Sequence, residues 1–111
     1  MGFAASQARL LALVARKSDL ELSAQFIDQQ KLYLANMVNG LFNMYTRLSP
    51  DDPGSKYLDA QIRTLQTADK TLDLHLRRIN TQREAVTEEL KTVEKVIQEN
   101  TKSSFGLMNG N

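Results

Sequence analysis

Apolar residues in the second half of the chain recur at alternating spacings of four and three residues. Only Asp69 and Arg83 interrupt this pattern. An average spacing of about 3.5 residues places the apolar side chains on one stripe of an α-helix, as in the seam of a coiled coil. The pattern predicts a helix over about residues 53–104, with a seam made of Leu58, Ile62, Leu65, Leu72, Leu76, Ile79, Val86, Leu90, Val93 and Ile97.

The first half of the chain carries a matching seam, in which an aliphatic residue returns every seven positions. Between these residues stand mostly apolar side chains, but also Lys17 and Lys31. The pattern predicts a helix over about residues 4–48. Polar interruptions in both seams are expected to fix the register of the two helices at some cost in stability. The seam residues of this helix are Leu13, Leu20, Ile27, Leu34 and Leu41.

One strong break separates the two patterns, at residues 49–54. Pro50 disfavours helical geometry at the residue before it, so the first helix is expected to stop there. Asp52 followed by Pro53 is typical of an N-cap with proline at the first helical position. A link this short makes the helices antiparallel neighbours. The sequence therefore predicts an all-α fold. We expect a long, coiled-coil-like antiparallel two-helix hairpin, a single domain over residues 1–111 completed by oligomerisation, with residues 106–111 frayed.

Asn39 and Gly40 form a weak point inside the first predicted helix. Glycine in a helix interior costs about 1 kcal/mol relative to alanine, and Asn-Gly is also a turn former. Two interpretations stay open: a kink in one long helix, or a corner that divides it and gives three helices.

A second apolar stripe remains on the first helix after its seam is assigned. A two-helix hairpin covers only one stripe of each helix, so another protein surface is expected to bury the second. That surface would close a small homo-oligomer or build a filament, because contacts with two different neighbours allow open-ended assembly. The predicted assembly interface consists of Leu11, Leu22, Phe26, Tyr33, Met37 and Met44.

Composition argues against catalysis and against nucleic acid as a partner. The 14 basic and 13 acidic residues give a net charge of +1, so no general field attracts polyanions or an anionic membrane. Cysteine is absent and His75 is the only histidine, which excludes a Cys/His metal site. We therefore expect no enzyme activity, no metal and no cofactor.

Targeting features are few. The apolar run from Leu10 to Ala15 is flanked by basic residues and is too short to span a bilayer. We expect no membrane insertion, and a location either in the bacterial cytoplasm or outside the cell after export without a cleaved signal peptide.

The Pro50-Asp51-Asp52-Pro53 turn resembles the Pro-x-x-Pro turn of the needle proteins of bacterial type III secretion systems. Val96 to Asn100, with Phe105 beyond, is loosely similar to the end of that family's second helix. The resemblance implies a helical hairpin that packs into a tube, with the second helix lining the interior. The positions that it would place in the lumen are Lys91, Lys95, Gln98 and Asn100.

The chain also departs from the needle family. Its predicted second helix is about two turns longer, and its beginning is apolar from Leu10 onward, where needle proteins are polar. The opening residues 4–11 are more similar to the terminal helices of flagellar axial proteins. Two functional hypotheses follow. One is a structural protein that self-assembles, such as a filament subunit of a secretion or axial apparatus. The other is a helical adaptor or export chaperone that binds one partner protein as a small oligomer.

Overall fold

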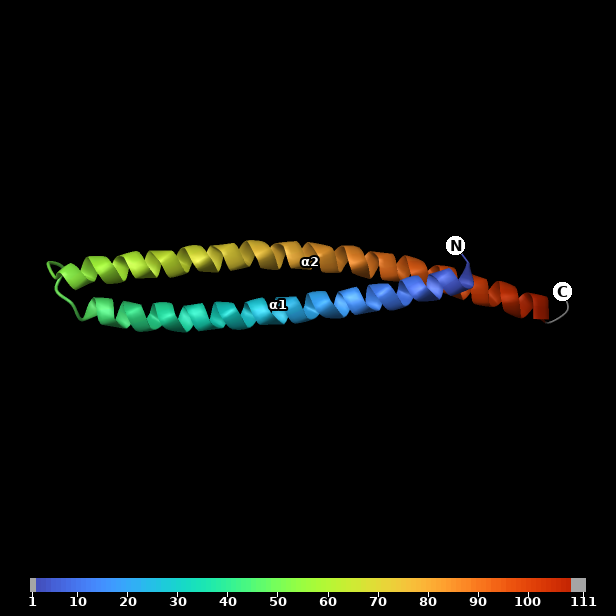
Figure 1. Ribbon diagram of the computed structural model, residues 1–111, viewed down its shortest axis with the longest axis horizontal. Coiled ribbons are helices and arrows are strands. Elements are labelled where there is room, and N and C mark those ends of the chain that lie inside the picture. Colours follow the sequence, from blue (N-terminus) through green and yellow to red (C-terminus); the bar gives the residue numbers. More distant parts are fainter. Residues whose placement is uncertain (1, 109–111) are drawn as a thin grey trace. The chain divides into compact units, whose positions relative to one another are not determined.

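The protein folds as two helices joined by a short turn in a computed structural model that describes residues 2–108 (Figure 1). Helix α1 spans Phe3–Thr46 and has 44 residues, and helix α2 spans Pro53–Met108 and has 56 residues. No strand occurs among the described residues. The prediction of an all-α helical hairpin is confirmed.

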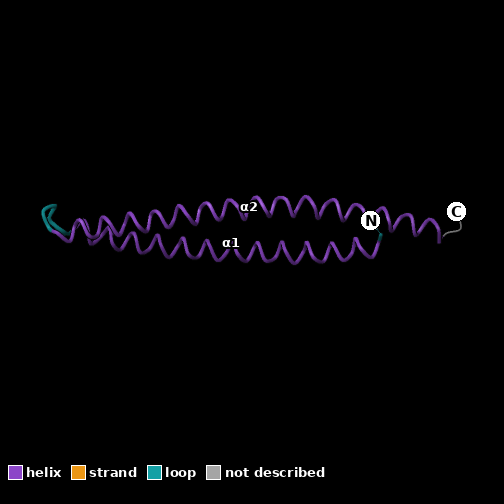
Figure 2. Tube along the Cα trace, turned by 45° about the horizontal axis from the view of Figure 1, so that its top comes forward, coloured by secondary structure: helices purple, strands orange, loops and turns teal. Residues whose placement is uncertain are grey.

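Contacts along the chain divide it into two compact units, which we describe separately. The terminal unit comprises Met1–Leu22 and Ile79–Asn111, and the turn unit comprises Ser23–Arg78. Within each unit a stretch of α1 lies beside a stretch of α2 that runs in the opposite direction (Figure 2). The expectation of a single domain stays a prediction.

The terminal unit has a compact apolar core. It is made of Leu13 and Leu20 from α1 and Val86, Leu90 and Val93 from α2. Burial of each such side chain stabilises the folded state by about 1.5–3 kcal/mol. The core is extended by the partly buried residues Leu10, Ile79 and Ile97.

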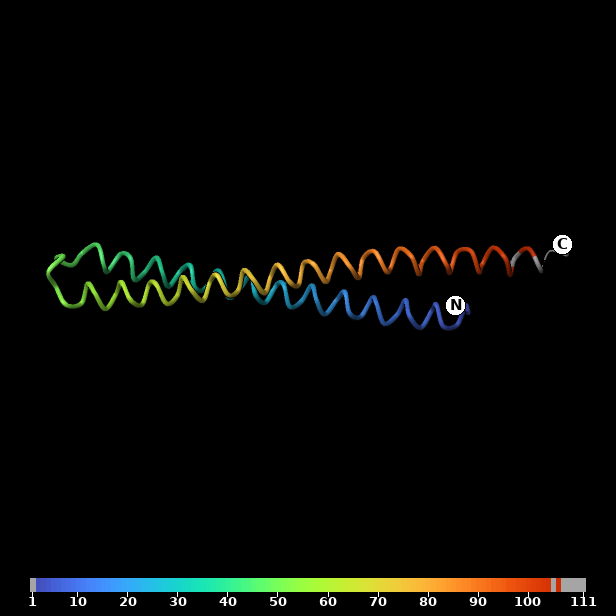
Figure 3. Tube along the Cα trace, turned by 90° about the horizontal axis from the view of Figure 1, so that it is seen from above, coloured from blue at the N-terminus to red at the C-terminus, as the bar shows by residue number. Residues whose placement is uncertain are grey.

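The last turns of α2 run past the start of α1 (Figure 3). Helix α2 continues to Met108, so residues 106–108 are part of the helix, and the expectation that the end of the chain frays stays a prediction. Gly106 costs only about 1 kcal/mol relative to alanine, and leucine and methionine, the next two residue types, are good helix formers. Residues 109–111 lie outside the described residues.

The turn unit is less well covered along its seam. Ala24, Ile27, Leu58 and Ile62 are buried. The other seam residues of this unit are only half-buried: Leu34, Leu41, Leu65, Leu72 and Leu76. Two helices alone therefore leave much of this seam partly open to solvent.

The turn begins and ends as its residue types require. The backbone N–H of Gly54 donates to Oδ1 of Asp52 at 2.8 Å, which is an N-cap bond at the start of α2. The predicted start at Pro53 is confirmed. Helix α1 ends at Thr46, slightly before the predicted residue 48. Its end tightens, because the N–H groups of Arg47 and Leu48 donate to carbonyls only three residues back, at 3.1 and 3.2 Å.

Gly40 lies inside the continuous helix α1, so the hypothesis of a corner at Asn39-Gly40 is wrong. A Cβ atom added at Gly40 would have no atom within 4 Å apart from its chain neighbours and the nearby backbone of its own helix. The packing of the chain on itself therefore gives no reason for glycine at this position.

Replacing Asp52 by alanine removes the cap of α2. We expect Asp52→Ala to lower the free energy of unfolding by about 1 kcal/mol, the usual cost of a lost N-cap. Urea denaturation followed by circular dichroism measures this change. Asp51→Ala is the matched control, because the side chain of Asp51 makes no capping bond to α2, and equal losses in the two variants would contradict the assignment.

Candidate assembly surface

Large exposed apolar side chains are concentrated on α1. Among the residues whose side chains are described, eleven belong to α1 and two, Tyr57 and Leu74, belong to α2. Apolar residues lie on all sides of α1, whereas those of α2 gather on one face. All six residues of the predicted assembly interface are exposed: Leu11, Leu22, Phe26, Tyr33, Met37 and Met44.

The predicted interface is divided between the two units. Leu11 and Leu22 belong to the terminal unit, where they are 72% and 61% exposed. The other four residues belong to the turn unit, together with Tyr57 of α2. In the turn unit, therefore, both helices contribute exposed apolar residues to the surface.

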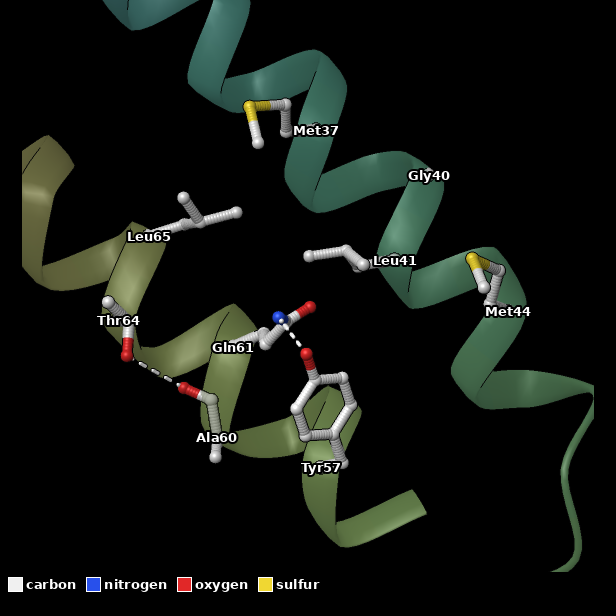
Figure 4. Close-up of a pocket in the computed structure, with 9 residues that line it drawn as sticks. All are labelled: Met37, Gly40, Leu41, Met44, Tyr57, Ala60, Gln61, Thr64 and Leu65. Atoms are coloured by element: carbon white, nitrogen blue, oxygen red, sulfur yellow. Dashed lines mark hydrogen bonds between the residues drawn. The ribbon is translucent and has the colours of Figure 1, made fainter. Parts of the chain in front are cut away.

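Two hollows open between α1 and α2 in the turn unit. The first has a volume of about 610 Å³ and lies near the turn, where Met37, Gly40 and Met44 of α1 face Tyr57 and Thr64 of α2 (Figure 4). The second has a volume of about 550 Å³. It is lined by Gln29, Gln30, Tyr33, Leu34, Ala68, Thr71 and Leu72. We call the residues lining these two hollows the groove face.

None of the residues that line the two hollows is charged. Eight members of the groove face belong to α2: Tyr57, Ala60, Gln61, Thr64, Leu65, Ala68, Thr71 and Leu72. Five of these are spaced four and three apart, so they share one side of the helix: Tyr57, Gln61, Thr64, Ala68 and Thr71. Two residues later the same spacings place charged residues on another side of the helix, interrupted by Gln66: Asp59, Arg63, Lys70, Asp73 and Arg77. Asp69 lies between the two sides. Helix α2 thus separates an uncharged side from a mostly charged one.

Several polar groups on the α2 side of the groove face have hydrogen-bond partners within that helix. The hydroxyl of Thr64 donates to the carbonyl of Ala60 at 3.0 Å, and Nε2 of Gln61 donates to the hydroxyl of Tyr57 at 2.8 Å (Figure 4). The hydroxyl of Thr71 likewise donates to the carbonyl of Thr67, at 3.2 Å. Because these groups already have partners, an apolar occupant would leave none of them unpaired.

Two polar interruptions of the seams meet in the turn unit. Nζ of Lys31 donates to Oδ1 of Asp69 at 3.0 Å, and it also contacts Oδ1 of Asp73. The hydrogen bond to Asp73 and then the one to Asp69 raise the pKa of Lys31 above its ordinary value of 10.5. In the terminal unit the other two interruptions, Lys17 and Arg83, line one pocket together with acidic side chains.

All predicted seam residues are at least partly covered. Eight are buried: Leu13, Leu20, Ile27, Leu58, Ile62, Val86, Leu90 and Val93. Seven are half-buried: Leu34, Leu41, Leu65, Leu72, Leu76, Ile79 and Ile97.

The residues singled out by the resemblance to needle proteins are mostly at the surface. Lys91, Lys95 and Gln98 are exposed, while Asn100 is half-buried. Within the described chain, Nδ2 of Asn100 has no hydrogen-bond partner. In the turn, Pro50 and Pro53 are exposed and Asp52 is half-buried. The side chain of Phe105 lies outside the described residues.

The α2 side of the groove face was missed from the sequence. Apart from Tyr57 and the seam residues Leu65 and Leu72, its residues are small or polar, so a search for large apolar side chains passes over them. The signal that would have found them is the absence of charge at Tyr57, Gln61, Thr64, Ala68 and Thr71, while another side of the same helix is mostly charged.

Comparisons with protein-family models, with curated proteins and with solved structures find no match to this chain. Among residues 2–108, no group of three or more acidic or histidine side chains is placed to hold a metal ion. Neither helix, over the described residues, combines the length and apolar character that crossing a membrane requires.

Lys31 gives the turn unit a stability that depends on pH. Its pKa is raised in the folded state, so its contribution is present below pH 10.5 and is lost as the pH rises through the higher folded-state pKa. We expect the free energy of unfolding of Lys31→Met to fall less than that of the wild type over this alkaline range. Urea denaturation at each pH measures the difference.

Lys17→Met is the control for this experiment, since it removes a seam lysine of the other unit. It should keep the full alkaline loss. An equal alkaline loss in the wild type and in Lys31→Met would contradict the pairing.

Proposed function

We propose that this chain is a non-catalytic structural protein that self-assembles through exposed apolar residues of α1. The observation that carries the proposal is the stretch from Leu32 to Thr46, in which no residue is charged. Large apolar side chains of this stretch are exposed, among them Tyr33 at 66% and Met44 at 54%. A helix that is apolar on several sides is usually buried by neighbours.

The free energy available from this surface supports association. Removing an apolar side chain from water is worth about 1.5–3 kcal/mol when it is fully buried. Phe26 and Tyr33 are each more than 60% exposed, and Met37 and Met44 lie on the same side of α1. Contact over these four residues therefore offers several kcal/mol, set against the cost of bringing two chains together.

Exposed apolar residues also lie on other sides of α1, which favours open-ended assembly. Phe42 is 53% exposed and stands two positions from Met44. At about 100° per residue these side chains point to nearly opposite sides of the helix. Two contacts with different neighbours generate a filament when the rotation between them does not close. A filament subunit of a secretion or axial apparatus is the form of this function that the resemblance implies.

The test is a double substitution of large apolar residues of α1. We expect Phe26→Gln/Tyr33→Gln to keep its helicity but to lose assembly, because it removes two exposed rings without touching the seam. Light scattering over a concentration series, with negative-stain microscopy, measures assembly, and circular dichroism measures helicity.

Leu74→Gln is the matched control, since Leu74 is similarly exposed but lies on α2. It should assemble as the wild type does. Unchanged mass in the double variant would contradict the proposal. A wild type of fixed small mass at every concentration would instead favour the adaptor or export-chaperone hypothesis.

A further inference from the structure

The groove face of the turn unit restricts what can occupy it. Neither hollow is lined by a charged residue, and the charges of α2 lie on another side of the helix. An ionised side chain placed there would lose its hydration without gaining a partner, at a cost of several kcal/mol. The occupant must therefore be uncharged over the length of the groove face.

This chain itself contains a segment of matching chemistry and length. The stretch from Leu32 to Thr46 is the longest uncharged part of the sequence. At about 1.5 Å per residue it is a helix of roughly 20 Å. The α1 wall of the groove face extends from Gln29 to Met44, which is nearly the same length.

The floor and walls of the groove face suit a closely packed helix. Ala60, Thr64 and Ala68 of α2 carry short side chains, and Gly40 of α1 carries none. Apart from its chain neighbours and the nearby backbone of its own helix, no atom lies within 4 Å of the Cβ position at Gly40. Large side chains of α1, such as Tyr33 and Met37, provide ridges that fit between such small residues when helices pack.

We infer that the groove face is the seat of a second copy of this chain, whose Leu32–Thr46 segment packs into it. This inference rests on the proposed function, and it specifies the partner and the surface. Ridge and groove belong to the same face of the turn unit. The contact is therefore isologous: each copy inserts its α1 into the groove of the other, and four helices surround a shared apolar core.

Three aromatic side chains alone supply about half of the area that each partner buries in a standard interface. Three exposed aromatic side chains lie on or beside the groove face: Phe26, Tyr33 and Tyr57, each 61–66% exposed. An aromatic side chain buries about 150–250 Å² in full, so these three alone would bury roughly 300–450 Å² per copy. A standard interface buries about 800 Å² per partner. Met37, Met44 and the half-buried seam leucines of the turn unit supply further apolar area.

The experiment fills the groove with apolar bulk. Thr64→Leu/Ala68→Leu places one leucine in each hollow and makes the surface more hydrophobic. If a second copy sits in the groove, the added side chains clash with it, and half-association should require at least a tenfold higher concentration. Analytical ultracentrifugation over a concentration series measures this change, and circular dichroism checks that helicity is kept.

Thr67→Leu/Ala85→Leu is the matched control. It adds the same two leucines at exposed positions of α2 outside the residues that line the two hollows, and Thr67 makes the same bond to its own helix as Thr64 does, at 3.0 Å. This variant should associate as the wild type does.

The outcomes separate this inference from the proposed function. If the groove-filled variant associates as tightly as the wild type, or more tightly, the groove inference is overturned while self-assembly stands. If the wild type is monomeric throughout the series, both are overturned. Weakened association of the groove-filled variant alone, with an unaffected control, supports the inference.

Discussion

A hairpin of two helices can bury one stripe of each helix, and the rest of the molecule depends on this limit. In the terminal unit the buried stripes form a compact core around Leu13, Leu20 and Leu90, while Leu11 and Leu22 stay exposed. In the turn unit the seam itself is only half-buried over much of its length, and α1 again carries apolar side chains on more than one side. In our account, a further partner is needed to bury the apolar side chains of α1 that the hairpin leaves exposed. The uncharged side of α2 defines where that partner fits.

The polar positions in the seams favour one register of the two helices. Lys31 placed opposite Asp69 and Asp73 satisfies three charges at once, and a shift of one heptad would separate them. Apolar heptads alone are nearly equivalent under such a shift, since leucine follows leucine every seven residues. The same register brings Tyr57 opposite Met44, and so creates the hollow near the turn.

Much of this fold can be predicted from the sequence, because one repeat of apolar residues determines both helices and their seams. The four-and-three spacing gives the helices and their seams, and Asp52-Pro53 gives the start of α2. The ends of helices are less predictable: α1 stops at Thr46 through a tightened last turn, and α2 continues through Gly106. Asn39-Gly40 misleads because local turn propensity is weaker than the continuous seam around it.

Only the α1 part of the candidate surface could be predicted from the sequence. Large residues such as Tyr33 and Met44 stand out in a helical pattern, but a groove lined by alanine and threonine does not. Only the pairing of the helices shows that Thr64 and Ala68 lie across from these large side chains. The small residues can be recognised in the sequence only because the positions that share their side of α2 carry no charge.

The central claim is that the groove side of α2 becomes buried when chains associate. The natural sequence has no cysteine, so single thiols at Thr64→Cys and Thr67→Cys report on two sides of the same helix. We predict that rising protein concentration slows thiol labelling at residue 64 but not at residue 67. Equal labelling rates at both positions, at concentrations where the mass has grown, would contradict the account.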